Sequence, residues 1–143
     1  MKSIFIPVSF LVCWCKIFSQ DLKGEWKGSF TDNLGGYKTT IIFTFSKIND
    51  STFEAFSKTF IKSNKITDSS ICIMRGGFLK KNILYLEETR TIKPFSSNDT
   101  GQCMQFMKLF YYKRQKQLAL KGDWFTEQNK CGYGSITLTK SYK

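Results

Sequence analysis

The feature that most constrains the fold of this chain is a regular alternation of apolar and polar residues along several short segments. In residues 22–30, LKGEWKGSF, every second position is apolar or glycine, and Lys, Glu or Ser stands between. Residues 37–46 and 135–139 show the same period of two. Because successive side chains of a strand point to opposite faces, this period predicts half-buried β-strands.

Five further segments have a weaker form of this pattern and complete a series of predicted strands. They are Thr52–Ile61, Ser69–Met74, Asn82–Glu88, Cys103–Tyr112 and Leu118–Thr126. Turn-forming residues separate the series, among them Asn49-Asp50-Ser51, Gly76-Gly77 and Lys80-Lys81-Asn82. A short helix around Phe56–Lys65 is a competing expectation for one segment. The series predicts an all-β fold, an antiparallel up-and-down meander of about eight strands that closes into a barrel and so removes its exposed edges.

A five-residue word, Leu-Lys-Gly-acid-Trp, occurs at both ends of this series, as LKGEW from Leu22 and LKGDW from Leu120. Alternation places Trp26 and Trp124 on inward faces, so we expect both indoles to be largely buried. Gly24 and Gly122 would then let the neighbouring strand approach closely. We expect the two copies to close one end of the barrel. The flanking residues do not repeat, so an internal duplication is not indicated.

The first twenty residues differ in character from the rest of the chain. Met1-Lys2 is followed by an apolar run over 3–15, which is too short to span a bilayer and has the length of a secretory h-region. We therefore predict a signal peptide over 1–20 with cleavage near Gln20, a single domain over 21–143, and a secreted or periplasmic protein. An uncleaved anchor and a buried first element are the alternatives.

The chain has five cysteines, and two of them lie in the predicted signal peptide. Cys13 and Cys15 follow Val and Trp rather than small residues, so lipid attachment is not expected. In an exported protein the remaining thiols can form a disulfide. We predict Cys103–Cys131, because each opens a strand-like run after a polar, glycine-containing stretch. Cys72 lies within an apolar run and is predicted to be a buried free thiol, although three cysteines allow three pairings.

The composition is basic, with 22 Lys and Arg against 11 Asp and Glu. The charge is spread along the chain, which is typical of a solvated surface, and it also suits an anionic surface or protein partner. Aromatic residues interleaved with lysine could stack on single-stranded nucleic acid. Export argues against that partner, so no nucleic acid is expected.

The residue types needed for most catalysis are absent or badly placed. The chain has no histidine, the commonest general base and metal ligand. It has no phosphate-binding loop, no dinucleotide-binding glycine pattern and no Cys-x-x-Cys pair. Glu87 and Glu88 are adjacent and would point to opposite faces of a strand. We therefore expect a protein that is not an enzyme and that needs no metal or cofactor.

Two parts of the chain resemble known protein groups. Gly24-x-Trp26 on a first strand resembles the signature of lipocalins and the wider calycins. That resemblance implies a barrel whose narrow end is closed by the glycine and tryptophan, with Lys140 of the last strand packing on the indole. Lipocalins typically have arginine at that position and add a C-terminal helix, which is not readable here. The ending, with LKGDW, Cys131 and GSITLTK, resembles small uncharacterised exported proteins of Bacteroidetes-type bacteria.

Two functions of different class follow from this reading. The leading one is non-catalytic binding of a small hydrophobic or amphipathic ligand inside the barrel. The residues expected near such a ligand are Phe43, Phe45, Tyr85, Phe106 and Leu118. The alternative is a protein- or surface-interaction module whose core is filled by side chains, with the aromatic segment Met104–Tyr112 as its contact surface.

Overall fold

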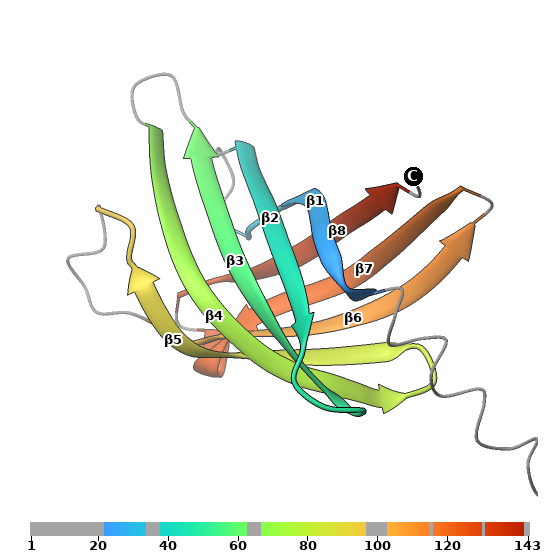
Figure 1. Cartoon of the computed structure of the whole chain (residues 1–143). Coiled ribbons are helices and arrows are strands. Elements are labelled where there is room, and N and C mark those ends of the chain that lie inside the picture. The colour runs from blue at the N-terminus through green and yellow to red at the C-terminus, as the bar shows by residue number, and fades with distance from the viewer. Residues whose placement is uncertain are drawn as a thin grey trace, which may run out of the picture.

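The computed structural model describes residues 22–33, 38–62, 67–96, 103–114, 116–129 and 131–141, and they form an eight-stranded antiparallel barrel (Figure 1). The strands are β1 (Gly24–Phe30), β2 (Lys38–Lys47), β3 (Thr52–Lys62), β4 (Thr67–Lys80), β5 (Ile83–Lys93), β6 (Gln105–Arg114), β7 (Gln117–Thr126) and β8 (Tyr133–Ser141). A short 3-10 turn, η2 (Glu127–Asn129), precedes β8. Each strand pairs with its neighbours in chain order, and β8 pairs with β1. The predicted all-β meander and its closure are confirmed.

The two ends of the barrel differ in how the strands are joined. We call the end where β1 begins the base, and the end where β1 finishes and β8 begins the mouth. At the base, short turns join β2 to β3, β4 to β5 and β6 to β7. In the first of these turns the side-chain oxygen of Asn49 accepts hydrogen bonds from the backbone N–H groups of Ser51 (3.0 Å) and Thr52 (2.9 Å). The predicted turn at residues 49–51 is therefore present.

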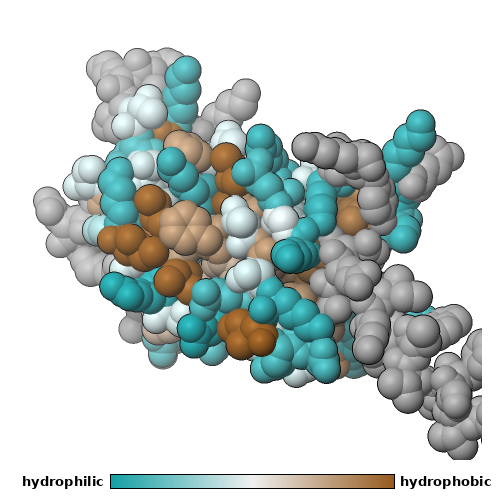
Figure 2. Space-filling model, viewed as in Figure 1, coloured by the Kyte–Doolittle hydropathy of each residue, from teal (hydrophilic) through white to brown (hydrophobic). Residues whose placement is uncertain are grey.

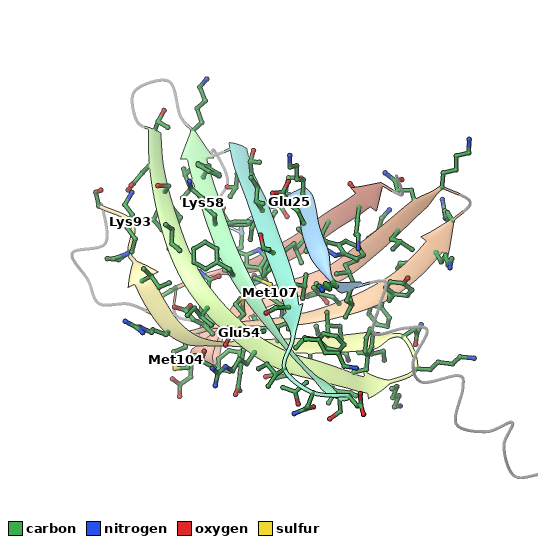
Figure 3. The ribbon with its side chains drawn as sticks, viewed as in Figure 1. Glu25, Glu54, Lys58, Lys93, Met104 and Met107 are labelled. Carbon is green, nitrogen blue, oxygen red and sulfur yellow. A yellow bond between two sulfur atoms is a disulfide. The ribbon has the colours of Figure 1, made fainter. Side chains whose placement is uncertain are left out.

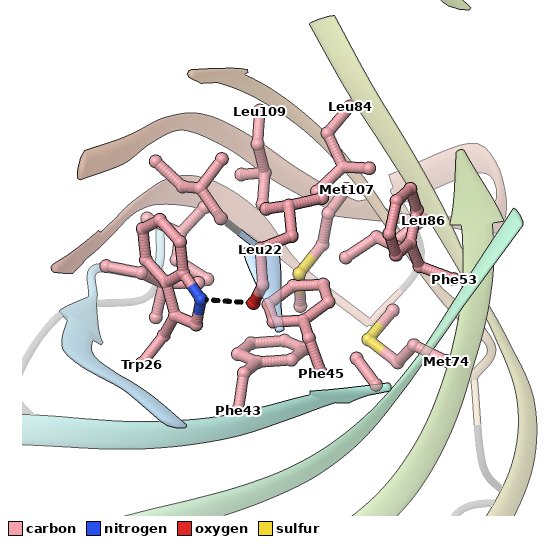
Figure 4. Close-up of a cluster of buried hydrophobic side chains, with 14 of the residues drawn as sticks. Leu22, Trp26, Phe43, Phe45, Phe53, Met74, Leu84, Leu86, Met107 and Leu109 are labelled. Carbon is pink, nitrogen blue, oxygen red and sulfur yellow. Dashed lines mark hydrogen bonds between the residues drawn. The ribbon is translucent and has the colours of Figure 1, made fainter. Parts of the chain in front are cut away.

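The base is filled by apolar side chains around Trp26, which is fully buried (Figure 4). The indole Nε1 of Trp26 donates a hydrogen bond to the carbonyl oxygen of Leu22 at 2.8 Å. The ammonium of Lys140 lies 5.9 Å from the centre of the indole ring and donates to the carbonyl oxygen of Lys23. Gly24 adopts φ 108°, a left-handed backbone conformation that favours glycine. The packing of Lys140 on Trp26 is as the lipocalin resemblance implies.

Trp124 is also buried, but it lies toward the opposite end of the barrel. Its Nε1 donates to the carbonyl oxygen of Thr31 at 2.7 Å, and its ring meets that of Phe30 edge-on at 5.1 Å. Thr31 is five residues beyond Trp26 on the chain, which is about 16 Å along an extended strand. The expectation that both copies of the word close one end is therefore wrong. β1 and β7 run in the same direction, and the word stands at the start of β1 but near the end of β7.

The prediction for Gly122, the glycine of the second copy, is confirmed. A side chain at Gly122 would overlap the backbone carbonyl of Lys108 on β6, so glycine is needed for the close approach of that strand. The disulfide Cys103–Cys131 is present near the mouth, with its Cα atoms 6.0 Å apart. Cys72 is a buried free thiol. Both cysteine predictions are confirmed.

Two local expectations are wrong. Residues 56–62 belong to β3 rather than to a helix, because alternate burial along Thr52–Lys62 stabilises a strand between β2 and β4. Gly76-Gly77 is not a turn but lies within β4, where Gly77 pairs with Thr52 on one side and Tyr85 on the other. Pairing on both sides outweighs the turn tendency of the two glycines.

The predicted signal peptide over 1–20, with Cys13 and Cys15, lies outside the described residues. In the described part of the chain, no helix has the length and apolar character needed to cross a membrane.

Candidate functional site

The side chains inside the barrel change from apolar to polar partway along three neighbouring strands. From base to mouth, the buried series is Phe53, Ala55, Ser57 and Thr59 on β3; Met74, Cys72 and Ser70 on β4; and Leu84, Leu86 and Glu88 on β5. On β3 and β4 the change occurs at one level, because Ala55 pairs with Met74 and Ser57 pairs with Cys72. On β5 it comes one inward position nearer the base, because Glu88 pairs with Met74. Below this level lie the apolar residues of Figure 4, and above it the wall made by β3–β5 is polar.

Cys72 lies at the centre of this polar wall. The register places it opposite Ser57 on β3 and opposite Thr91 on β5. Its Sγ atom is 3.6 Å from the hydroxyl oxygen of Ser70, within hydrogen-bonding distance for sulfur. The four side chains together present hydroxyl and thiol groups, which can both donate and accept hydrogen bonds.

Glu88 supplies a carboxylate to the same wall, although its residue is only 3% exposed. One carboxylate oxygen accepts a hydrogen bond from the hydroxyl of Thr91, and the other accepts from the backbone N–H of Gln105 at 3.3 Å. Burial, and then the negative charge of Glu88, raise the pKa of the Cys72 thiol to about 11. At neutral pH the wall therefore carries a protonated thiol, which is a poor nucleophile.

The wall across the barrel has the opposite character. The eight strands form a closed ring in chain order, so β3–β5 face β7, β8 and β1. Toward the mouth these strands contribute Phe30, Trp124 and Ile136, and Ile136 is 1% exposed. The mouth half of the barrel thus has one wall that forms hydrogen bonds and one wall that is mainly aromatic and aliphatic, with Thr126 of β7 as a buried polar residue.

Three of the five residues predicted to line a ligand site point into the barrel. Phe43, Phe45 and Leu118 are all buried. Phe43 and Phe45 stack at 5.6 Å between ring centres and belong to the apolar cluster of the base (Figure 4). Phe43 pairs with Ser57, so it lies at the boundary between the base and the polar wall.

The expected inward direction of the other two residues is wrong. On β5 the inward positions belong to Leu84 and Leu86, which places Tyr85 on the outer face. On β6 the inward position belongs to Met107, and the neighbouring Phe106 stacks outside on Phe125 at 5.7 Å. Both strands carry bulky residues on both faces, so alternation alone left their direction undecided. Figure 4 shows Met107 within the buried cluster, and Figure 3 labels it in the middle of the barrel.

Sequence reasoning missed the polar wall itself. Ser57 follows Phe53 and Ala55 in phase, and Glu88 follows Leu84 and Leu86 in phase, so each stands where an inward apolar residue is expected. That signal was readable, since a polar residue in the buried phase of a strand marks a polar interior. The pairing of Cys72 with Thr91 was not, because β-bulges shift the register between β4 and β5. Among the described residues, no group of three Cys, Asp or Glu side chains could hold a metal ion.

Comparison with known proteins identifies the fold but no family. No protein-family model and no curated protein sequence matches the chain. Among the solved structures that match are three barrels, two of them described as redesigned. A redesigned β-barrel named mFAP1, solved bound to DFHBI, has a TM-score of 0.62 and 15% identity, over 85% of this chain and 97% of its own. EF1p2_mFAP2b, also bound to DFHBI, has a TM-score of 0.59 and 12% identity, over 87% of this chain and 96% of its own. The redesigned barrel b11L5F_LGL has a TM-score of 0.56 and 14% identity, over 87% and 95%. At these identities the likeness shows the fold alone: a closed eight-stranded antiparallel β-barrel of the lipocalin-like kind.

Proposed function

We propose that this chain is an exported, non-catalytic binding protein that holds a small amphipathic molecule in the mouth half of its barrel. The observation that carries the proposal is the shared change from apolar to polar inward side chains on β3, β4 and β5, opposite a wall made mainly by Phe30, Trp124 and Ile136. A ligand with one hydrogen-bonding edge and one apolar face fits two such walls. The base, filled by side chains, would form the floor of the site.

The size of the side chains supports the same half of the barrel. An eight-stranded barrel is just wide enough to be filled by its side chains or to hold one small ligand. Ser57, Ser70 and Cys72 occupy much less volume than the Phe, Leu and Met residues of the base. Two of the matching barrels with this fold were solved with the small molecule DFHBI bound. A barrel of this construction can therefore accept a guest of that size.

Mass spectrometry under native conditions tests the proposal with three proteins purified in parallel from the natural host. Wild type and Thr44→Leu, an exposed position on β2, should both carry a small-molecule adduct. Ser57→Leu should lose it, because the larger side chain fills the polar wall at a stability cost of about 1–3 kcal/mol. Circular dichroism establishes that each variant is folded. An adduct retained by folded Ser57→Leu, or no adduct on any of the three, would contradict the proposal.

Export is the part of the proposal that concerns the chain's location. The Cys103–Cys131 disulfide fits an oxidising compartment, and the apolar run over 3–15 fits a signal peptide. N-terminal sequencing of protein from the extracellular or periplasmic fraction should find Asp21 first. Protein retained in the cytosol with an intact Met1 would exclude export.

A second candidate function is attachment to a surface, and an outer apolar patch favours it. Phe56 of β3 is 42% exposed and pairs with Ile73, and the next row pairs Lys58 with Ile71 and Ile71 with Lys93. Figure 2 shows apolar side chains gathered among hydrophilic ones on the face toward the viewer, and Figure 3 labels Lys58 on β3 and Lys93 at the end of β5. Co-sedimentation with vesicles of anionic lipid, compared between wild type and Phe56→Ser, tests whether this patch binds a surface.

A further inference from the structure

The outer surface of β7 and β8 carries a shallow, open groove near the mouth, separate from the barrel interior. Its volume is about 450 Å³, and residues of β7, η2 and β8 line it. They include Asp123, Trp124, Phe125, Asn129, Tyr133 and Ser135. The groove is too open to enclose an apolar molecule, so any ligand must keep part of its surface in water.

Two aromatic rings form the apolar part of this groove. Phe125 on β7 pairs with Tyr133 on β8, so their side chains are cross-strand neighbours on the outer face. Phe125 is held in place by stacking on Phe106, with the ring planes inclined by only 18°. Tyr133 is 49% exposed, although burial of such an aromatic ring would be favourable. The pair offers a partner an exposed aromatic surface.

Polar groups lie beside the rings. Asp123 pairs with Ser135 across β7 and β8, and Asn129 ends η2. Asp123 makes no ion pair or hydrogen bond with any residue that the structure describes. The side chains of Asp123 and Asn129 together provide carboxylate acceptors and an amide that both donates and accepts. These groups can replace water around the hydroxyl groups of a ligand.

A disulfide and several hydrogen bonds hold the backbone around the groove in place. Cys131, two residues before Tyr133, is fixed to Cys103 by the disulfide. The hydroxyl of Thr126 accepts from the backbone N–H of Cys131 and donates to the carbonyl of Gly132, each at 3.0 Å. The backbone N–H of Tyr133 donates to the side-chain oxygen of Asn33 at 3.0 Å. A groove fixed in this way loses little conformational freedom when it binds.

We propose that this groove is a binding subsite for a neutral sugar ring within an oligosaccharide. A pyranose has an apolar face of C–H groups, which suits the rings of Phe125 and Tyr133, and a rim of hydroxyls, which suits Asp123 and Asn129. The carboxylate of Asp123 disfavours phosphate and other anionic ligands. An extended peptide would need a free sheet edge, and each described strand already has two neighbours. The site lies outside the barrel and goes beyond the ligand function proposed above.

Binding of a panel of soluble hexasaccharides, of β-linked glucose, N-acetylglucosamine or a uronic acid, tests the proposal by calorimetry or NMR titration. Wild type should bind at least one neutral member saturably. Tyr133→Ala should weaken that binding about tenfold through the lost ring contact. Adding Asp123→Ala to that variant should weaken the binding further. The matched control is Tyr112→Ala, which removes a tyrosine of similar exposure, 44%, at the base end of β6. That variant should bind like wild type.

Three results would overturn the proposal. The first is no saturable binding of any neutral hexasaccharide by the folded, disulfide-bonded wild type. The second is an equal loss in Tyr112→Ala, which would place the contact elsewhere. The third is binding of the uronic acid alone that 0.5 M salt abolishes and Tyr133→Ala does not change, because attraction by the basic surface explains that result. Each variant is checked for native thermal unfolding before it is titrated.

Discussion

The base and the mouth of this barrel are built from the same eight strands but are stabilised in different ways. At the base, Trp26 lies among fully buried Leu, Phe and Met side chains, under short turns. At the mouth, Trp124 donates a hydrogen bond to Thr31 and faces the polar wall across the barrel, and the chain is held by hydrogen bonds and the Cys103–Cys131 disulfide. An apolar interior stabilises a fold but leaves no room for a guest. The comparison teaches that the apolar core that stabilises the fold and the polar interior that we propose as a ligand site lie at opposite ends of one barrel.

The largest expected loss of stability comes from a substitution at the base of the barrel. Trp26→Ala removes a fully buried indole, its hydrogen bond to Leu22 and its contact with Lys140. We expect the free energy of unfolding to fall by about 3–5 kcal/mol, as large aromatic deletions in cores do. Urea denaturation followed by circular dichroism measures it. The comparison variant is Trp124→Ala, which should lose stability at the lower end of that range because Trp124 is 7% exposed whereas Trp26 is fully buried. An equal or larger loss for Trp124→Ala would show that the two ends are not distinct in stability.

The next effect concerns the mouth. The double variant Cys103→Ser, Cys131→Ser opens a loop with a sequence separation of 28 residues. In the chain-entropy model the loss is about 3.5 kcal/mol. Urea denaturation should give the same value for wild type reduced before unfolding, and Cys72→Ser, treated identically without reductant, should keep the disulfide contribution. A difference below about 1 kcal/mol would mean that the hydrogen bonds around Thr126 hold the mouth without the disulfide.

The smallest expected effect is a change in the pKa of Cys72 in the polar wall. Glu88→Gln removes a charge that helps to raise the pKa of Cys72, so that pKa should fall below about 11 while burial keeps it above the ordinary value of 9.0. The pH dependence of Cys72 alkylation by iodoacetamide, followed by mass spectrometry, measures the shift. Glu87→Gln is the control, because Glu87 is exposed on the outer face. An unchanged alkylation profile in Glu88→Gln would show that the charge of Glu88 does not raise the pKa of the Cys72 thiol.

The raised pKa of Cys72 also makes the free energy of unfolding fall as the pH rises. The folded protein keeps the Cys72 thiol protonated at pH values where the thiol of the unfolded chain ionises. This contribution to stability is complete below about pH 9 and is lost as the pH rises toward 11. Over that interval wild type should lose more of its free energy of unfolding than Cys72→Ser does.

Most of the architecture was predictable from alternation, because a strand has only two faces and a closed sheet has no edges. The burial of both tryptophans, the barrel topology and the disulfide follow from local patterns in LKGEW, LKGDW and the cysteine positions. The places where prediction failed are those where a local pattern does not contain the deciding contact. Gly76-Gly77 reads as a turn until pairing on both sides is known, and Tyr85 can point either way until Leu84 and Leu86 are seen to fill the core.

The candidate sites were less predictable for a related reason. The polar wall depends on Ser57, Cys72 and Glu88 reaching neighbouring levels of the barrel from three strands, and the place of Glu88 relative to Cys72 depends on register shifts between β4 and β5. The outer groove depends on residues of β7 and β8 that lie on the solvent face, where polar and aromatic residues carry no pattern. Sequence periodicity identifies which residues are inside, but it does not say which of them meet.

The pairing of β8 with β1 also determines how the chain can fold. It joins Lys27 to Thr139, two residues 112 positions apart, and it is the step that closes the ring. Contacts this distant in sequence form slowly, because the entropy of a very long loop is lost before the pairing can stabilise it. Until the last strand has left the ribosome, β1 has a partner on only one side, and its other edge can pair with any strand it meets. A chain shortened before Thr139 should therefore aggregate rather than form a smaller barrel.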